Sequence, residues 1–189
     1  MTERLHHMAF RCRDSEETRV FYEEVIGLPL AAALPIEVSA TGRAVHVMHT
    51  FFALKDGSFV AFFEVPESPF EFRDQHDFDL HLALEADAED IDRAVAAATA
   101  RGVEVRGPSD HGFIRSTYFR DPNGYVVELA LRTHIHEAFD AEAPKAARAI
   151  LDAWRAKQAP APQPAGNTGG ANVPATRPMP PPSDLAPLV

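Results

Sequence analysis

The chain has 189 residues and a formal charge of -10, a length that predicts one compact domain with an appendage. Its acidity makes nucleic acid a poor partner, and no apolar stretch approaches the roughly 20 residues of a membrane span. Because the N-terminal sequence MTERLHHMAF lacks the apolar run of a signal peptide and Cys12 is the single cysteine, we expect a cytoplasmic protein without a disulfide that acts on small molecules.

The first predicted elements are a short strand starting near His7 and a helix after it. Asp14 or Ser15 provides the N-cap of this helix, with Glu17 three positions after Asp14, and Gly27 provides a left-handed stop. Between these signals apolar residues recur at helical spacing, at Phe21, Val25 and Ile26. The run VHVMHTFFALKDGSFVAFFEV then has a Lys-Asp-Gly-Ser turn between two apolar stretches, which predicts a β-hairpin.

The second half of the chain repeats this design. The segment from His81 aligns without a gap with the segment from His7, and again gives a strand followed by a helix, from about Asp87 to Gly102. The apolar stripe of this helix is Ile91, Ala94, Val95 and Ala98. A second hairpin is predicted around the Asp-Pro-Asn-Gly turn at 121–124. Each half therefore predicts a strand, a helix and about three more strands.

The C-terminal part departs from this pattern. A last helix is predicted from about Asp140 to Lys157, with Pro144 in its first turns. We expect its apolar stripe of Ile150, Leu151 and Trp154 to pack over the core, and a lid or a partner contact is the alternative. From Ala159 onward Pro, Gly and Ala dominate, which predicts a flexible tail over 159–189 that buries no face.

Two histidines and two glutamates occupy matching places in the repeats. His7 and His81 begin the paired strands, and Glu64 and Glu128 lie in the last strands of the hairpins. If the halves are related by a rotation, these groups converge. Imidazole with carboxylate suits Fe(II), Mn, Zn, Ni or Co, whereas Ca prefers oxygen alone. We expect His7, His81 and Glu128 to hold a divalent metal, with Glu64 either a fourth ligand or a carboxylate at the rim.

The chain resembles the vicinal oxygen chelate superfamily, which includes glyoxalase I, extradiol dioxygenases and fosfomycin or bleomycin resistance proteins. The resemblance covers about residues 4–132. It rests on His7 in LHHMAFRCRD, on FYEEVIGLP, on His81 in LHLALEAD and on DPNGYVVE ending at Glu128. Members that only sequester a drug lack the ligands, so the resemblance favours an enzyme.

The same resemblance implies an α+β fold. Two βαβββ modules, about 4–68 and 78–132, would form a curved mixed sheet that makes a cup around the metal. A helical extension at 133–158 and the tail would follow. The cup can close within one chain or by exchange across a dimer, and we expect a homodimer with a small-molecule substrate.

Two chemistries compete. The segment HGFIRSTYFRDPNGYVVE resembles the signature of the extradiol dioxygenases. The residues that match the order of that signature are His111, Tyr118, Asp121, Pro122, Gly124 and Glu128. Ser109 and Thr117 depart from it. This reading implies Fe(II) with three open positions, two for a catechol-like aromatic and one for dioxygen. Tyr118 and His111 would be acid, base and hydrogen-bond groups, and His49 a further candidate base.

The alternative is a glyoxalase-like or epimerase-like lyase or isomerase. Its metal would take Glu64 as the fourth ligand and polarise an enediolate as a Lewis acid. Arg11 could neutralise a substrate carboxylate in either reading. We favour the dioxygenase, because glyoxalase does not need the pair of His111 and Tyr118, and we keep a non-catalytic binder as a third hypothesis.

Overall fold

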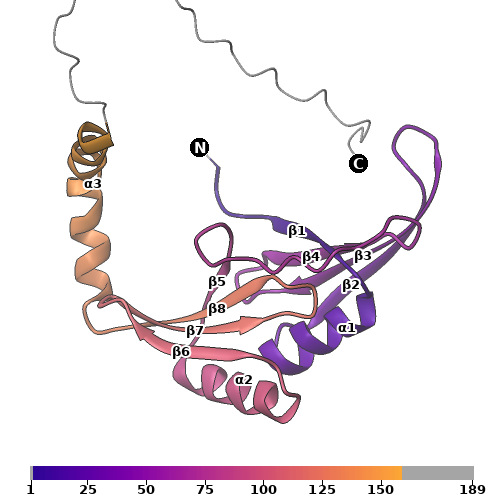
Figure 1. Ribbon diagram of the computed structural model, residues 1–189, viewed down its shortest axis with the longest axis horizontal. Coiled ribbons are helices and arrows are strands. Elements are labelled where there is room, and N and C mark those ends of the chain that lie inside the picture. The colour runs from indigo at the N-terminus through magenta and orange to yellow at the C-terminus, as the bar shows by residue number, and fades with distance from the viewer. Residues whose placement is uncertain (1, 159–189) are drawn as a thin grey trace, which may run out of the picture. The chain divides into compact units, whose positions relative to one another are not determined.

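The computed structural model describes residues 2–158 and divides into two compact units, 1–136 and 137–189. The first unit contains two four-stranded sheets with the strand orders β1-β4-β3-β2 and β5-β8-β7-β6 (Figure 1). The first sheet is built from β1 His7–Cys12, β2 Leu30–Val38, β3 Ala44–Ala53 and β4 Phe59–Glu64. The second is built from β5 Leu82–Glu85, β6 Val105–Asp110, β7 Ile114–Arg120 and β8 Val126–Arg132.

The two sheets have the same topology. In each one the first strand of the module pairs in parallel with the last, β1 with β4 and β5 with β8, and the other pairings are antiparallel. A helix follows each first strand, so the expected pair of βαβββ modules is confirmed. The turns at 55–58 and 121–124 connect β3 to β4 and β7 to β8, as the sequence predicted.

Matching caps start the two helices. The Asp14 carboxylate accepts a hydrogen bond from the backbone N–H of Glu17, and Asp87 does the same for Asp90. The first helix is α1 Ser15–Arg19 continued by the π-helix η1 Val20–Ile26, and the second is α2 Ala88–Ala100. Gly27 ends η1 with a φ of 93°, a backbone conformation that favours glycine.

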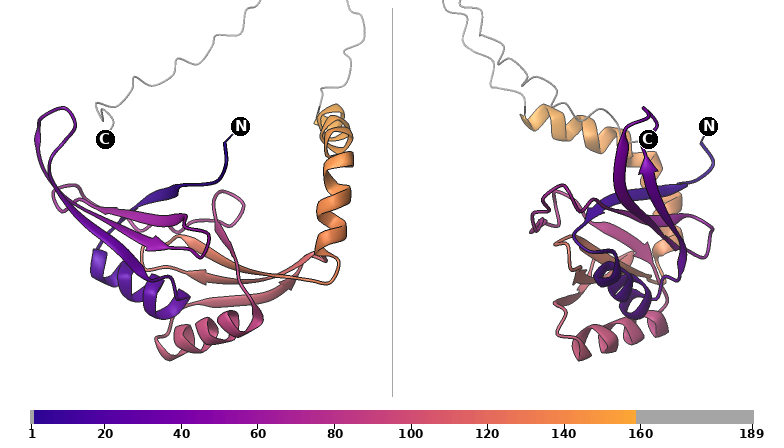
Figure 2. Two further views of the ribbon diagram at one scale, coloured as in Figure 1. Left: turned by 180° about the vertical axis from the view of Figure 1, so that it is seen from behind. Right: turned by 90° about the vertical axis from the view of Figure 1, so that its right-hand side faces the viewer.

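The core lies on the helix side of both sheets. Helices α1 and α2 lie on the same side of the sheets in Figures 1 and 2. Buried residues of the strands and helices form one apolar cluster there: Cys12, Phe21, Tyr22, Val25, Ile26, Phe52, Val60, Phe62, Leu84, Ile91, Ala94, Ala98, Phe119, Tyr125, Val127 and Leu129. Strand alternation directs the residues between them to the opposite side. We call that side the open face of each sheet.

The turn at 121–124 also joins the two modules. The hydroxyl of Tyr22 donates to Asp121 Oδ2 over 3.2 Å, and the side-chain amide of Asn123 donates to Thr18 over 3.2 Å. The rings of Phe10 and Tyr125 lie 5.0 Å apart between their centroids. Asp121 is buried, and this burial raises the pKa of its carboxyl. The predicted hairpin turn is therefore also a buried polar contact between the modules.

The second unit contains α3, His136–Gln158, which begins earlier than the predicted Asp140 and includes Pro144. No described residue of α3 is buried, and the packing of its apolar stripe over the core stays a prediction, because α3 belongs to the second unit. Ile150, Leu151 and Trp154 are 66%, 51% and 60% exposed. The predicted tail at 159–189 lies outside the described residues. Within residues 2–158, no helix has both the length and the apolar character needed to cross a membrane.

Candidate metal centre

His81 and Glu128 lie together on the open face of the second sheet. Glu128 pairs in register with Ala83, two residues after His81, so alternation puts all three on one side. His81 Nε2 is 3.2 Å from Glu128 Oε2. The other ring nitrogen, Nδ1, lies 2.7 Å from the backbone carbonyl of Asp77 and donates to it. This bond selects the tautomer whose Nε2 lone pair faces the carboxylate, which is the arrangement of a metal-binding histidine.

Ser116 holds the other oxygen of Glu128. Its hydroxyl donates to Glu128 Oε1 over 2.5 Å, and both side chains are buried. The sequence analysis did not identify Ser116. The only signal in the sequence was its position two residues before Tyr118, which places both on the same face of β7.

Tyr118 and His111 form a second pair on the same sheet. Tyr118 is directly opposite Glu128 in the register of β7 and β8, and its hydroxyl lies 3.1 Å from His111 Nε2. The Arg106 guanidinium lies 5.4 Å from the centroid of the Tyr118 ring and makes two hydrogen bonds to the Asp77 carboxylate. Arg106 also lowers the pKa of Asp77. Through Arg106, Tyr118 is therefore connected to Asp77, whose backbone carbonyl orients His81.

His7 lies on the first sheet, beside His49. The two ring centroids are 6.4 Å apart, and His7 also contacts Phe51 with a centroid distance of 5.7 Å. The His49 ring stacks on Phe63 at 3.7 Å, and its Nδ1 donates to the Phe62 carbonyl over 2.9 Å. Burial lowers the pKa of His49. His49 is therefore neutral at neutral pH, with Nε2 as the nitrogen that can accept a proton.

Glu64 requires a correction, because it lies on the helix side of the first sheet. It pairs in register with Cys12, a core residue, and its carboxylate accepts a hydrogen bond from the backbone N–H of Ser15 at the start of α1 over 2.8 Å. The expectation that Glu64 joins His7 around a metal conflicts with this placement. The position that corresponds to Glu128 in the first module is Ala61, since Ala61 pairs with Ala9 as Glu128 pairs with Ala83.

Arg11 shares the open face with His7 by strand alternation. Its Nη2 lies 3.2 Å from the carbonyl oxygen of Ser68 and 3.5 Å from that of Val65. The guanidinium therefore already binds the segment that follows β4. A substrate carboxylate would have to compete with these two acceptors.

The structure thus gathers some of the expected residues and not others. Within residues 2–158, no three His, Cys, Asp or Glu side chains lie close enough together to hold a metal ion. His81 and Glu128 provide two donors, and His7 lies on the other sheet beside His49. One imidazole nitrogen and one carboxylate oxygen, each oriented by an outer contact, fit a divalent transition metal.

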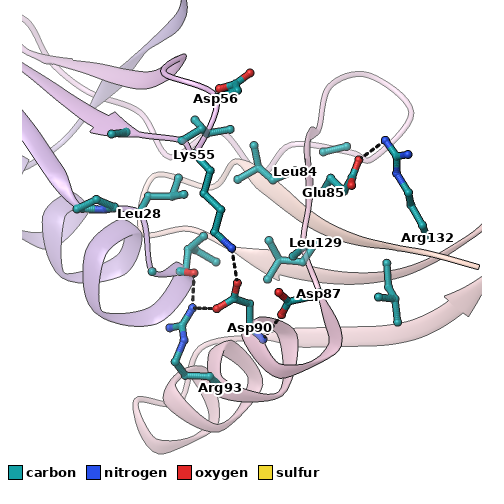
Figure 3. Close-up of a pocket in the computed structure, with 18 residues that line it drawn as sticks. Leu28, Lys55, Asp56, Leu84, Glu85, Asp87, Asp90, Arg93, Leu129 and Arg132 are labelled. Carbon is teal, nitrogen blue, oxygen red and sulfur yellow. Dashed lines mark hydrogen bonds and ion pairs between the residues drawn. The ribbon is translucent and has the colours of Figure 1, made fainter.

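A separate pocket of about 890 Å³ contains none of the predicted site residues. Figure 3 shows its charged side chains, where Lys55 Nζ is 3.3 Å from Asp90 Oδ2 and Arg93 Nη2 is 3.5 Å from Asp90 Oδ1. Arg132 pairs with Glu85 over 2.6 Å. The cations drawn there, Lys55, Arg93 and Arg132, are each paired with an acid of the chain, so none of these three is left unpaired to select an anionic ligand.

Two family models match the chain, one in each unit. The model of the glyoxalase/bleomycin resistance protein/dioxygenase superfamily matches residues 4–129. A second family model, for a protein of unknown function (DUF3703), matches residues 137–189. The search of curated proteins gave no match to the sequence.

Several solved structures are similar to the chain. The fosfomycin resistance protein FosX from Mesorhizobium loti is 26% identical, with 73% of this chain and 98% of that chain covered and a TM-score of 0.54. A glyoxalase/dioxygenase from Nostoc punctiforme is 29% identical, with coverages of 69% and 92% and a TM-score of 0.51. FosX from Listeria monocytogenes, solved with Mn(II), shares the fold at 19% identity, with coverages of 73% and 99% and a TM-score of 0.51.

Proposed function

Because the chain belongs to the glyoxalase/bleomycin resistance protein/dioxygenase superfamily, we propose that it is an enzyme whose divalent metal is held by His7, His81 and Glu128. The observation that carries the proposal is the 3.2 Å contact between His81 Nε2 and Glu128 Oε2, with each side chain fixed on its far side by Asp77 or Ser116. Glu128 is only 4% exposed, and a bound cation would offset the cost of burying its charge.

We assign the third ligand to His7 of a second copy. Within one chain the second sheet brings together two donors, while His7 lies on the open face of the first sheet. Exchange across a homodimer would set the first sheet of one chain against the second sheet of the other. The repeat supports this arrangement, because His7 and His81 hold equivalent positions in two modules of the same topology.

The number of ligands favours the dioxygenase over the lyase. With Ala61 at the position equivalent to Glu128 and Glu64 on the helix side, the chain offers three ligands and not four. When bound, a three-ligand Fe(II) centre would orient two adjacent oxygens of a catechol-like substrate and leave a position for dioxygen. Mn, Ni, Zn or Co would suit the same donors.

The protein's own groups fit this chemistry. Tyr118 faces the position next to Glu128, and its hydroxyl can pass a proton to His111 Nε2 across 3.1 Å. Neutral His49 offers a base from the first sheet. Phe51 and Phe63 flank His49 and supply an apolar wall suited to an aromatic ring.

Fosfomycin is a second candidate substrate, because 26% identity relates the chain to the fosfomycin resistance protein FosX from Mesorhizobium loti over 98% of that chain. Fosfomycin is a small anionic phosphonate and would need cationic groups at the site. Arg11 and Arg106 lie on the open faces, but each already binds an acceptor of the chain itself. This pairing favours the aromatic substrate.

The proposal is tested by loading the full chain anaerobically with Fe(II), adding a catechol and then admitting air. A yellow ring-fission product and oxygen uptake are expected. The His81→Ala variant should lose both, whereas His46→Ala should retain them, since His46 is an exposed histidine paired with Glu67. Consumption of fosfomycin without oxygen uptake would support the second candidate, and tight ligand binding without turnover would point to a non-catalytic binder.

A further inference from the structure

Arg106 lies in the same row of the second sheet as Glu128. The register pairs Arg106 of β6 with Tyr118 of β7, and Tyr118 with Glu128 of β8, so the three side chains share the open face. Two strand spacings of about 4.8 Å each separate Arg106 from Glu128 along this row. A guanidinium is no ligand for a cation, and at this distance its positive charge opposes one.

The guanidinium of Arg106 instead binds the linker that connects the two modules. Its two terminal nitrogens donate to the two carboxylate oxygens of Asp77 over 2.9 and 2.8 Å. A bidentate pair of this kind fixes the plane of the carboxylate as well as its distance. The same guanidinium lies 5.4 Å from the centroid of the Tyr118 ring. Arg106 therefore holds Asp77 next to the second sheet.

Asp77 lies in a turn that brings its backbone carbonyl to His81. The backbone N–H of Asp79 donates to the carbonyl of His76 over 3.0 Å, which closes the turn. The carbonyl of Asp77 accepts from His81 Nδ1 over 2.7 Å, and this bond leaves Nε2 as the nitrogen that faces Glu128. The tautomer and the orientation of His81 thus depend on where Asp77 is held.

The linker relies on side-chain contacts of this kind, because residues 65–81 contain no helix or strand. Before Asp77 it is attached to the turn between β7 and β8. The backbone N–H of Gln75 donates to the carbonyl of Gly124 over 2.9 Å, and Arg120 donates to the carbonyl of Gln75 over 3.1 Å. The two bonds from Arg106 continue this attachment at Asp77, the residue that binds His81.

We propose that Arg106 is a positioning residue that sets the tautomer and orientation of His81 through Asp77. Its consequence for metal binding rests on the proposed function, whereas its effect on His81 exists without a metal. Charge alone makes the opposite prediction. If only the local field mattered, removing the positive charge of Arg106 would tighten the binding of a cation, whereas loss of the anchor of Asp77 weakens it.

Titration of the full chain with Mn(II) distinguishes these two effects. Arg106→Gln and Asp77→Ala should each raise the Kd for Mn(II) by about three- to tenfold, and the double variant should be no worse, since both changes remove the same contact. Glu104→Gln is the matched control. It removes the acid that lies 3.2 Å from Arg106 Nε, leaves both bonds to Asp77 and should not change the Kd. An unchanged or lower Kd in Arg106→Gln would overturn the proposal.

Imidazole NMR spectra of the metal-free chain test the effect on His81 itself. The Nδ1 proton of His81 should give a resonance protected from exchange with water, identified by its loss in His81→Gln. In Arg106→Gln it should exchange faster, whereas Arg106→Lys, which keeps one hydrogen bond to Asp77, should retain part of the protection. The Nδ1 proton of His49, bonded to the Phe62 carbonyl, is the internal control and should not change.

The two measurements keep this inference separate from the proposed function. If the wild-type chain binds no Mn(II), the proposed function fails, and the spectra still decide the role of Arg106. Equal protection of the His81 Nδ1 proton in the wild type and in Arg106→Gln would contradict that role even if the wild-type chain binds the metal. Circular dichroism verifies that each variant is folded.

Discussion

His81 Nε2 and Glu128 Oε2 lie 3.2 Å apart, and each side chain is held from behind by a different element. The carbonyl of Asp77 accepts from His81 Nδ1, and the hydroxyl of Ser116 donates to Glu128 Oε1. His81 Nε2 and Glu128 Oε2, the two atoms that would bind the metal, are therefore oriented in advance. This reduces the loss of side-chain freedom that accompanies metal binding.

Loss of the Ser116 hydroxyl should weaken metal binding. Ser116→Ala leaves Glu128 Oε1 without its hydrogen-bond donor, so the carboxylate is less well oriented. We expect a loss of affinity of about 10- to 100-fold, measured by competition with a chelating dye. Thr117→Val removes a hydroxyl from the next residue, which faces the other side of β7, and should leave the affinity unchanged. Equal losses in both variants would mean that Ser116 acts only through folding.

The Glu64→Gln variant tests whether the metal site has three ligands or four. Because Glu64 binds the backbone N–H of Ser15 at the start of α1, its neutralisation should cost about 1 kcal/mol of stability or less. Metal affinity should not change. Thermal unfolding and metal titration measure the two quantities, and a marked drop in affinity would return Glu64 to the ligand set.

Tyr118→Phe should affect turnover and not metal binding. The Tyr118 hydroxyl contacts His111 Nε2, so its removal interrupts proton transfer and should lower kcat by about 10² to 10⁴. Tyr125→Phe, a change in the core, is the matched control and should retain turnover. An unchanged kcat in Tyr118→Phe would remove this residue from the mechanism.

His49 predicts the pH dependence of the reaction. Burial lowers its pKa, so His49 should stay neutral to below the ordinary value of about 6.5. Activity that needs His49 as a base should therefore fall only at more acid pH than that. In His49→Gln this acid limb of kcat/KM should disappear together with much of the activity. An acid limb that persists unchanged in the variant would belong to another group.

Asp121 predicts the pH dependence of stability. Burial raises its pKa in the folded state, so folding favours the protonated form. The corresponding stability is present below the unfolded pKa of about 3.9 and is lost as pH rises through the folded value. Asp121→Asn should flatten this decline, which denaturant unfolding at a series of pH values can follow. A decline of the same size in the variant would assign it to other groups.

The repeat and its caps made most of the fold predictable. Asp14 and Asp87 start matching helices, and both hairpin turns occur where the turn residues predicted them. The nearness of His81 and Glu128 followed from equivalent positions in paired strands. Glu64 was misplaced because it lies three residues after Ala61, the position equivalent to Glu128, and an odd number of residues along a strand moves a side chain to the other face.

Two other features depend on contacts between distant parts of the molecule. Nothing in the local sequence of β7 distinguishes Ser116 from a surface serine, because its partner is on β8. For α3 the helical pattern was correctly recognised, but an apolar stripe does not reveal which surface covers it. The exposure of Ile150 and Trp154 on α3 therefore does not identify the surface that covers them, and their packing on the core stays a prediction.

Subunit complementation tests the central claim most directly. His7→Ala and His81→Ala variants should each fail to bind metal tightly. If His7 of one copy joins His81 and Glu128 of another, chains of the two variants that are unfolded together and refolded should recover up to about a quarter of the wild-type sites, because half of the dimers are mixed and each has one intact site. No recovery in the mixture, while the wild-type chain binds metal, would contradict a centre shared between two copies.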